Sequence, residues 1–181
     1  SWYVTLLLDK GKTSRRKMLV ALTEDNSPFI NEGKNILIEE FGTDYVTYFS
    51  VLTCIASGMK TRSEIENELH NDNIGPYLVK LEDYCKVITK SLPIFAKENS
   101  KKVRYHLNDC FLIFWFRFFY KYQALIENKA LKALGEIIQR DYSSVSGFMM
   151  ERYFMKKFQE EGRYIIGKWW DRKGENEIDL I

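Results

Sequence analysis

The sequence predicts an α+β fold that is mostly helical. Apolar side chains recur at helical spacing through most of the chain, whereas β-forming runs are confined to a stretch that ends near residue 107 and to the last residues. The chain of 181 residues is 45% apolar, with 4 Trp, 11 Tyr and 12 Phe, and it has only 10 Gly and 3 Pro. This composition supplies a buried core and excludes a disordered chain, and the length allows one or two small domains.

Charge and cysteine content narrow the class of protein. Lys and Arg number 27 against 25 Asp and Glu, so any contact with nucleic acid must come from local clusters of charge. The 3 cysteines form no Cys-x-x-Cys pair, which indicates neither a disulfide framework nor a zinc knuckle. The most apolar stretch, Cys110 to Phe116, is far shorter than the ~20 residues of a membrane span. We therefore expect a cytoplasmic protein with no membrane segment.

The first residue is Ser1 rather than Met, and no charged and then apolar leader follows it. We expect no secretion signal, and we expect the chain to be a fragment of a longer protein.

Three helices are predicted after helical material in residues 2 to 43. The first begins after Asp44 and ends at Gly58, which supplies a stop. The second begins at Thr61-Arg62-Ser63-Glu64, which matches a capping box and stabilises a helix start by about 1 kcal/mol. The third begins at Gly75-Pro76, because proline suits the first helical position.

A β-hairpin is predicted directly after these helices. Residues 87 to 95 are rich in β-formers, residues 97 to 101 form a polar turn, and residues 103 to 107 alternate as a half-buried strand does. Three helices followed by a hairpin describe a winged helix over residues 44 to 107. In that arrangement the third helix can enter a major groove while the hairpin turn lies over neighbouring phosphates.

The hairpin turn carries the strongest basic cluster of an otherwise balanced chain. We take five cations as candidate contacts to duplex DNA: Lys80 on the third helix and Lys97, Lys101, Lys102 and Arg104 in the hairpin. Two alternatives stay open, because exposed turns are often lysine-rich simply through solvation and winged helices also serve as protein-docking modules.

The rest of the chain is predicted to form a second unit. Most residues from Phe111 to Tyr122 are aromatic, which favours a buried central helix over a stacking platform for single-stranded bases. One amphipathic helix is expected over residues 128 to 142, a break at Ser143 to Gly147, and another helix over residues 148 to 161. Strands are expected at residues 164 to 170 and 177 to 181.

Two familiar kinds of site can be excluded. Gly11-Lys12-Thr13 has the end of a phosphate loop but lacks its upstream glycine, so this segment does not encode ATP binding. His70 and His106 have no arrangement of Ser or Cys around them that indicates a metal pair or a catalytic triad.

Two carboxylates in apolar surroundings form the candidate catalytic and metal site. Glu151 lies within an apolar helix, and Asp179 lies between Ile178 and Leu180 on the last strand. If helix and hairpin pack together, the pair can hold Mg²⁺, which keeps several waters and accepts phosphate oxygens, as in phosphodiester hydrolysis. The alternative is that both carboxylates are ordinary solvated groups of their elements.

Two long runs resemble signatures of one protein family. Residues 105 to 118 read YHLNDCFLIFWFRF, and residues 166 to 180 read IGKWWDRKGENEIDL. Both are similar to signatures of prokaryotic AAA+-type ATPases of the archaeal-ATPase group. The resemblance covers nearly the whole chain, and it implies a linker after a missing N-terminal ATPase core (1–43), a winged helix (44–107) and part of a C-terminal domain (108–181).

The resemblance also implies chemistry for the last domain. In that family it is similar to the PD-(D/E)XK nuclease fold, whose acidic residues come from a first helix, a second strand and an E-x-K on a third strand. Glu151 and Asp179 match the first two positions. No E-x-K follows Asp179 in this sequence, and the expected place of that motif lies beyond Ile181. The nuclease-like α/β unit is therefore expected to be incomplete.

The expected function is that of the DNA-interacting C-terminal region of an ATP-dependent ATPase. The intact protein would use ATP and Mg²⁺, whereas this chain binds no cofactor of its own and is catalytically silent. The alternative is a protein-docking scaffold without nucleic-acid chemistry. The sequence leaves the oligomeric state open.

Overall fold

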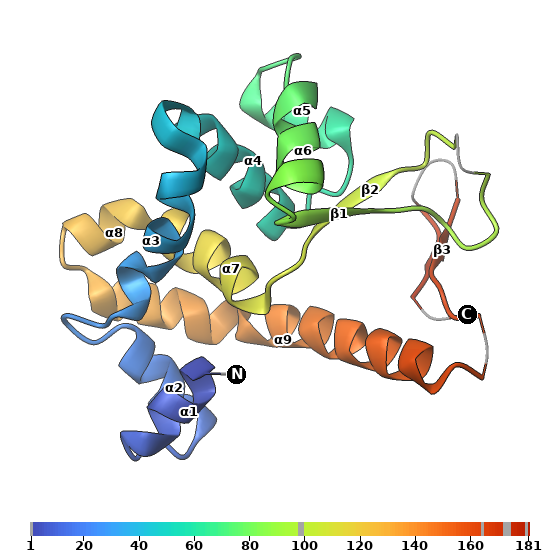
Figure 1. The fold of residues 1–181 in the computed structure, drawn as a ribbon. Coiled ribbons are helices and arrows are strands. Elements are labelled where there is room, and N and C mark those ends of the chain that lie inside the picture. Colours follow the sequence, from blue (N-terminus) through green and yellow to red (C-terminus); the bar gives the residue numbers. More distant parts are fainter. Residues whose placement is uncertain (1, 98–99, 164, 172–174, 180) are drawn as a thin grey trace.

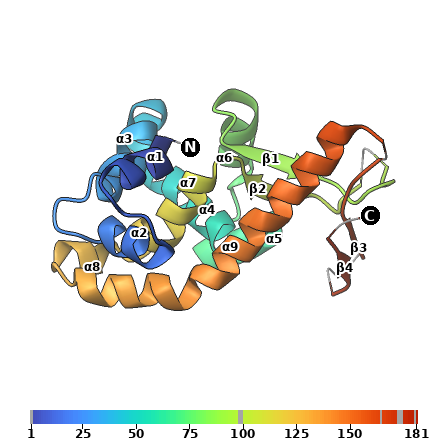
Figure 2. The same ribbon diagram turned by 90° about the horizontal axis from the view of Figure 1, so that it is seen from below.

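The computed structural model describes residues 2–97, 100–163, 165–171, 175–179 and 181. The long helix α9 (Leu131–Glu161) runs along one side of the molecule (Figures 1 and 2). The helical segments of residues 15–22, 115–120 and 123–127 contact this helix. The hairpin of β1 (Ile88–Ser91) and β2 (Arg104–Leu107) extends toward the C-terminal strands β3 (Trp169–Trp170) and β4 (Glu177–Ile178). The mostly helical α+β class is confirmed.

The N-terminal segment forms three helices, α1 (Trp2–Asp9), α2 (Arg15–Leu22) and α3 (Phe29–Phe41). Ser14 caps α2 by accepting a hydrogen bond from the backbone of Lys17. Buried side chains of all three helices join the same core as the later elements. One core runs through all three predicted segments, so packing does not mark a boundary at residue 43 or 107. The division of the chain into domains at these residues stays a prediction.

The three helices after residue 44 begin where the sequence places them. A 3₁₀ turn (Gly42–Asp44) leads into α4 (Tyr45–Ala56). The capping box at the start of α5 (Arg62–Leu69) is complete, with both the Thr61 side chain and the Glu64 side chain engaged. The third helix, α6 (Gly75–Val79), has proline at its start and continues as the π-helical turn η2 (Lys80–Tyr84).

The predicted hairpin is present as β1 (Ile88–Ser91) and β2 (Arg104–Leu107), which pair antiparallel. The register sets Ile88 opposite Leu107 and Ser91 opposite Arg104. Ile88 and Leu107 are buried, so this end of the hairpin is anchored in the core while the loop of residues 92–103 extends away from it (Figure 1). The order of three helices and a hairpin is confirmed, and its identity as a winged helix stays a prediction.

The aromatic segment is the centre of the core, as expected. It consists of α7 (Cys110–Phe114) and the π-helical η3 (Trp115–Tyr120), and Asp109 caps it by accepting from the backbone N–H of Leu112 (2.9 Å). The Trp115 indole lies directly over Gly33, where an added Cβ would come within 2.1 Å of the ring. Only glycine therefore permits α3 to approach η3 this closely.

The expected break at Ser143 to Gly147 is wrong. After α8 (Gln123–Glu127), residues Leu131–Glu161 form one continuous helix. Val145 lies in the middle of the expected break and is buried. Glycine and serine each cost less than about 1 kcal/mol in a helix, so burial of Val145 outweighs their weak propensity.

The C-terminal strands are shorter than expected. β3 covers only Trp169–Trp170 and β4 only Glu177–Ile178, paired antiparallel. Gly167 and Ile181 also exchange backbone hydrogen bonds (3.1 and 2.9 Å), which extends the hairpin in irregular form. Tyr164, at the expected strand start, lies outside the described residues.

The structure also bears on the membrane and disulfide expectations. Among the described residues, no helix combines the length and apolar character needed to cross a bilayer. Cys54, Cys85 and Cys110 are all free thiols, which agrees with the absence of a disulfide framework.

Candidate functional site

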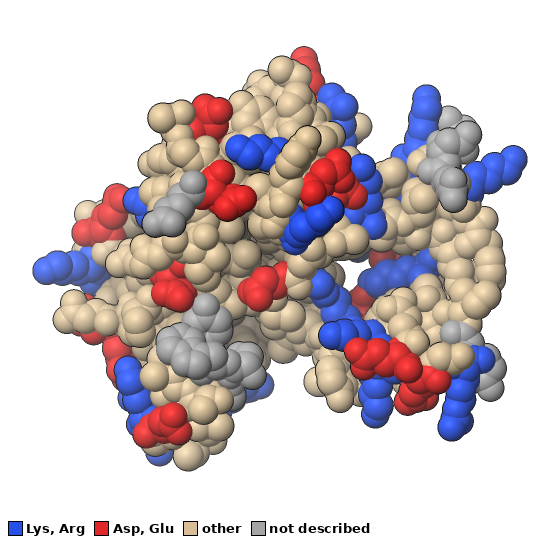
Figure 3. All heavy atoms as spheres, viewed as in Figure 1, with Lys and Arg blue, Asp and Glu red and all other residues tan. Residues whose placement is uncertain are grey.

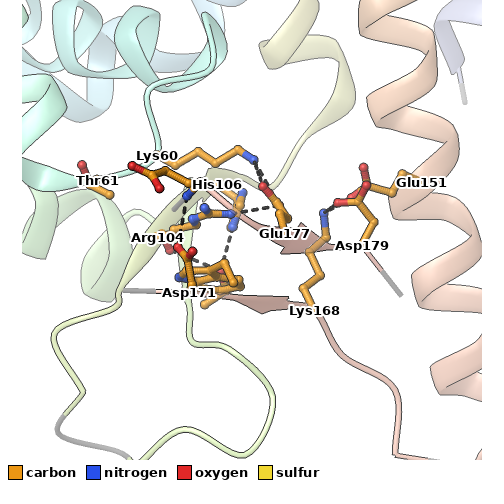
Figure 4. A network of polar contacts seen from close by, with 12 residues as sticks. Lys60, Thr61, Arg104, His106, Glu151, Lys168, Asp171, Glu177 and Asp179 are labelled. Carbon is orange, nitrogen blue, oxygen red and sulfur yellow. Dashed lines mark hydrogen bonds and ion pairs between the residues drawn. The ribbon is translucent and has the colours of Figure 1, made fainter. Parts of the chain in front are cut away.

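The two candidate carboxylates meet at one ammonium group. Lys168 forms ion pairs with Oε1 of Glu151, on α9, and with Oδ1 of Asp179, just after β4 (3.4 Å to the latter; Figure 4). The two acids therefore lie close to one another, on the same side of the molecule. Whether they act as catalytic or metal-binding groups stays a prediction.

The local fold explains how three distant residues converge. Gly162 ends α9 in the left-handed conformation, and the chain then turns back along the helix. Lys168 and Asp179 lie beside each other, because the Trp169–Ile178 pair is on one side of them and the Gly167–Ile181 hydrogen bonds are on the other. Glu151 faces them from α9.

The ammonium of Lys168 is largely withdrawn from solvent, with 17% of its side chain exposed. Burial, the largest influence, lowers the pKa of Lys168 from its usual value, whereas the charge of Asp179 and the hydrogen bond to it oppose this shift. The carboxylates thus already hold one cation. Lys168 was missed by the sequence analysis, since no spacing rule indicates which lysine of a hairpin turns toward a helix.

The protein residues at this site supply only some of the ligands that a hard cation needs. Across the ranges that the structure describes, no three or more His, Cys, Asp or Glu side chains gather closely enough to form a metal site. A divalent ion at Glu151 and Asp179 would therefore have two protein carboxylates and would take its other ligands from water or phosphate. This is the mode of binding that Mg²⁺ commonly uses.

A second polar network joins the C-terminal hairpin to β2. Glu177 forms ion pairs with Arg104 (2.9 Å) and with Lys60 (3.2 Å; Figure 4). The guanidinium of Arg104 lies over the Trp170 ring at 4.4 Å, and the Trp170 indole donates a hydrogen bond to the carbonyl of Lys102 (3.2 Å). This network fixes the position of the strands on which the Lys168 site depends.

Arg104 is placed differently from what a DNA contact requires. Its side chain is only 7% exposed and is committed to Glu177 and Trp170. We therefore remove Arg104 from the candidate phosphate contacts. The alternation predicted for this strand fails at Arg104, which is buried like its neighbour Tyr105. A buried partner for an arginine depends on tertiary packing that the sequence does not display.

The other predicted cations differ in their surroundings. Lys97 and Lys101 are exposed in the β1–β2 loop, where basic side chains project from the edge of the molecule (Figure 3). Lys102, in the same loop, is half-buried. Lys80 is also half-buried, and its ammonium lies 5.1 Å from the centre of the Tyr48 ring. Lys97 and Lys101 are thus the cations best placed for phosphate.

A cavity of about 540 Å³ separates the β1–β2 hairpin from the second half of α9. Figure 3 shows the molecule hollowed between these elements, with basic side chains around the opening. Arg152 and Lys168 line the cavity together with His106. Burial, followed by the charges of Lys168 and Lys60, lowers the pKa of His106 to about 4, so this imidazole is neutral at pH 7.

The partial phosphate loop has no free lysine. Lys12 pairs with Glu24 at 2.8 Å, which leaves its ammonium committed to a neighbouring carboxylate. That Gly11-Lys12-Thr13 is not a nucleotide site stays a prediction.

Comparison with known proteins places the chain near proteins of unknown function. Residues 115–181 match the family DUF234, described as archaeal and bacterial proteins of unknown function. An uncharacterized protein of Methanocaldococcus jannaschii is 37% identical over 147 residues, which is 75% of this chain and 32% of that protein. The chain thus spans about a third of the length of this curated relative. No solved structure matches the chain.

Proposed function

We propose that this chain is the DNA-interacting part of a larger ATP-dependent ATPase, with Glu151 and Asp179 as its site for Mg²⁺. The observation that carries the proposal is the convergence of both carboxylates on Lys168, beside a cavity whose other wall is the basic β1–β2 hairpin. The ATPase core is implied by the family resemblance, and the archaeal relative is long enough to contain a further domain.

The residues of the site have distinct tasks in this proposal. Glu151 and Asp179 present carboxylate oxygens from a rigid helix and from the end of the hairpin. They would hold Mg²⁺, which would supply the positive charge that polarises a phosphate oxygen and lowers the pKa of a water molecule. In this proposal Lys168 would give up its ion pairs with the carboxylates and would offer its positive charge to the phosphate. We expect no cleavage by this chain alone, because no E-x-K follows Asp179 in its sequence.

Lys97 and Lys101 supply the contact with duplex DNA. Both are exposed on a loop that projects from the rest of the molecule (Figure 3). The chain as a whole is nearly neutral, with a formal charge of +2, so the attraction to phosphate is local. Because the hairpin also faces the carboxylate site across the cavity, DNA held by the loop would lie near that site.

Binding of a short DNA duplex at a series of salt concentrations tests the DNA contact. Each phosphate contact contributes about 0.9 to the slope of log affinity against log salt concentration. We expect Lys97→Ala and Lys101→Ala each to reduce that slope by about this amount. Lys132→Ala, on the first turn of α9, is the control. A binding constant that does not depend on salt would contradict the proposal and favour the protein-docking alternative.

Cleavage is tested in a longer protein that includes the ATPase core. We expect magnesium-dependent nicking of duplex DNA that is lost in Glu151→Gln and in Asp179→Asn, while Glu160→Gln, an exposed carboxylate on the same helix, retains it. Nicking that survives both substitutions would remove the pair from the mechanism. Salt-dependent binding without any nicking would leave DNA contact and contradict the nuclease activity.

A further inference from the structure

The β1–β2 loop carries an aromatic side chain in an unusual position. Phe95 is 83% exposed, the highest value among the large apolar side chains described. Its φ is +62°, in the left-handed region that costs most residues about 1–2 kcal/mol. A bulky residue that is both strained and open to water gains nothing for the fold, and such outliers are often found where a molecule binds another.

Phe95 lies in a tight turn, which accounts for its positive φ. The backbone N–H of Ala96 donates to the carbonyl of Pro93 (3.0 Å), which closes a four-residue turn with Phe95 third. A positive φ at that position is typical of a type II turn, where glycine or asparagine is usual. The sequence places phenylalanine there instead.

The preceding residue holds the turn in place. Ile94 donates its backbone N–H to the carbonyl of Lys168 (2.7 Å). Its side chain packs on Gly167, where an added Cβ would come within 3.0 Å of Ile94. Ile94 thus points toward the C-terminal hairpin, and the next side chain, Phe95, points to solvent. The aromatic ring is presented by an anchored turn, so little conformational entropy remains to be lost when it binds.

The charges of the loop indicate the chemistry of the ligand. Lys97 and Lys101 follow Phe95 on the same loop and are exposed. Exposed cations next to an exposed aromatic ring match a polyanion that also offers flat apolar faces, which is the chemistry of nucleic acid. An apolar protein surface would form no favourable contact with the lysines, and a simple polyanion would form none with the Phe95 ring.

We infer that Phe95 stacks on a nucleic-acid base while Lys97 and Lys101 hold the adjoining phosphates. This inference rests on the proposed DNA contact and adds to it a base contact that no charge pattern indicated. The base can belong to an unpaired strand or to a step of a duplex into which the ring is inserted.

The test separates stacking from charge. The probes are a short duplex with an internal 2-aminopurine and the same duplex with that base in an unpaired overhang. We expect Phe95→Ala to weaken binding by about 5- to 100-fold while the salt slope stays that of the wild type. We expect Lys97→Ala to reduce the slope and keep the change in 2-aminopurine fluorescence at saturation. Tyr84→Ala, which removes another exposed aromatic ring, is the matched control.

Phe95→Gly tests whether the ring is retained for binding. Glycine relieves the positive φ, so the melting temperature should stay unchanged or rise by up to about 4 °C, while DNA affinity falls as in Phe95→Ala. A large drop in melting temperature would show a structural role and overturn the inference.

The remaining outcomes are also decisive. A fluorescence response confined to the overhang assigns an unpaired base, and a response in the intact duplex assigns insertion. If Lys97→Ala weakens binding and Phe95→Ala does not, the inference fails and the DNA contact stands. If the wild-type chain binds neither probe, both are contradicted.

Discussion

The aromatic core and the C-terminal hairpin are held together by different forces. Phe49 lies at the centre of the core, fully buried, with the rings of Trp115, Phe116 and Tyr120 edge-on at 5.9, 5.3 and 5.2 Å. The hairpin of β3 and β4 pairs only two residues on each strand and is held by Glu177 and Trp170. Apolar burial therefore secures the core, whereas ion pairs, hydrogen bonds and the single buried ring of Trp170 secure the part that carries the candidate site.

This difference affects what each region can do. Apolar burial involves no titrating group and responds much less than ion pairs do to moderate salt concentrations, so the core is a fixed support. Ion pairs respond to both, and a site held by them can be rearranged by a cation or a phosphate at moderate cost. Lys168 and Asp179 lie in the second region, and Glu151 faces them from α9, which suits the proposed site, where Lys168 would give way to a metal.

Truncation of the central ring has the largest expected effect. Phe49→Ala should lower the free energy of unfolding by about 3–5 kcal/mol, because it removes a fully buried ring and leaves a cavity. Urea denaturation monitored by tryptophan fluorescence measures the loss. Tyr84→Ala, at a ring that is 78% exposed, is the control. A loss below about 1 kcal/mol would contradict the central place of Phe49.

Acid should destabilise the fold through His106. The folded protein binds a proton there with a pKa of about 4, against 6.5 for the free side chain. Below pH 6.5 the unfolded chain takes up a proton that the folded chain rejects. The free energy of unfolding should therefore fall by about 3 kcal/mol as pH decreases from 6.5 to 4.

Chemical denaturation of His106→Gln across this pH range checks the attribution. The substitution should flatten the dependence on pH, and His70→Asn at the exposed histidine is the matched control. An identical pH dependence in wild type and His106→Gln would assign the effect to other groups.

Loss of the buried ion pair between Glu177 and Arg104 should have a smaller effect on stability than acid has through His106. Glu177→Gln leaves Arg104 buried without its countercharge, and we expect a loss of about 1–3 kcal/mol in the free energy of unfolding. Although burial works in the opposite direction, the hydrogen bond from Arg104 and the charge of Lys60 lower the pKa of Glu177. The stabilisation is thus present at neutral pH and is lost as the carboxylate becomes protonated in acid.

The exposed ion pair between Lys12 and Glu24 serves as the comparison for the buried pair of Glu177. Glu24→Gln breaks the surface pair with Lys12 and should change stability by less than about 1 kcal/mol. Thermal unfolding of the two variants at pH 7 gives the contrast. Equal effects would mean that the hairpin network does not depend on buried charge.

The smallest expected effect tests the continuity of α9. No atom lies within 4 Å of a Cβ added at Gly147, so Gly147→Ala should raise the free energy of unfolding by about 0.5–1 kcal/mol. Gly162→Ala should have the opposite sign, because its φ is +65°. If Gly147→Ala destabilises the protein, the helix is interrupted there as the sequence suggested.

Structural features that depend on neighbouring residues could be predicted from the sequence. Features that depend on contacts between distant residues could not. The cap at Thr61 and the presence of the hairpin follow from neighbouring residues, so both were predicted correctly, although β1 is shorter than the predicted run of residues 87 to 95. The continuity of α9 depends on the burial of Val145, and the burial of Arg104 depends on Trp170 and Glu177, which are far away in the chain.

The candidate site shows the same limit. Glu151 and Asp179 could be singled out because carboxylates in apolar surroundings are unusual. That Lys168 lies between them could not be predicted, since it requires both the turn after α9 and the irregular pairing of Gly167 with Ile181.

Binding of Mn²⁺ to the 181-residue chain, followed by isothermal titration calorimetry, tests the central claim most directly. If Glu151 and Asp179 form one cation site, Glu151→Gln and Asp179→Asn should each weaken binding by at least about tenfold. Lys168→Met should strengthen it, because the competing ammonium is gone, and Glu160→Gln should leave it unchanged. The account would be contradicted by equal Mn²⁺ affinity in the wild type and both carboxylate variants, or by no binding even in Lys168→Met.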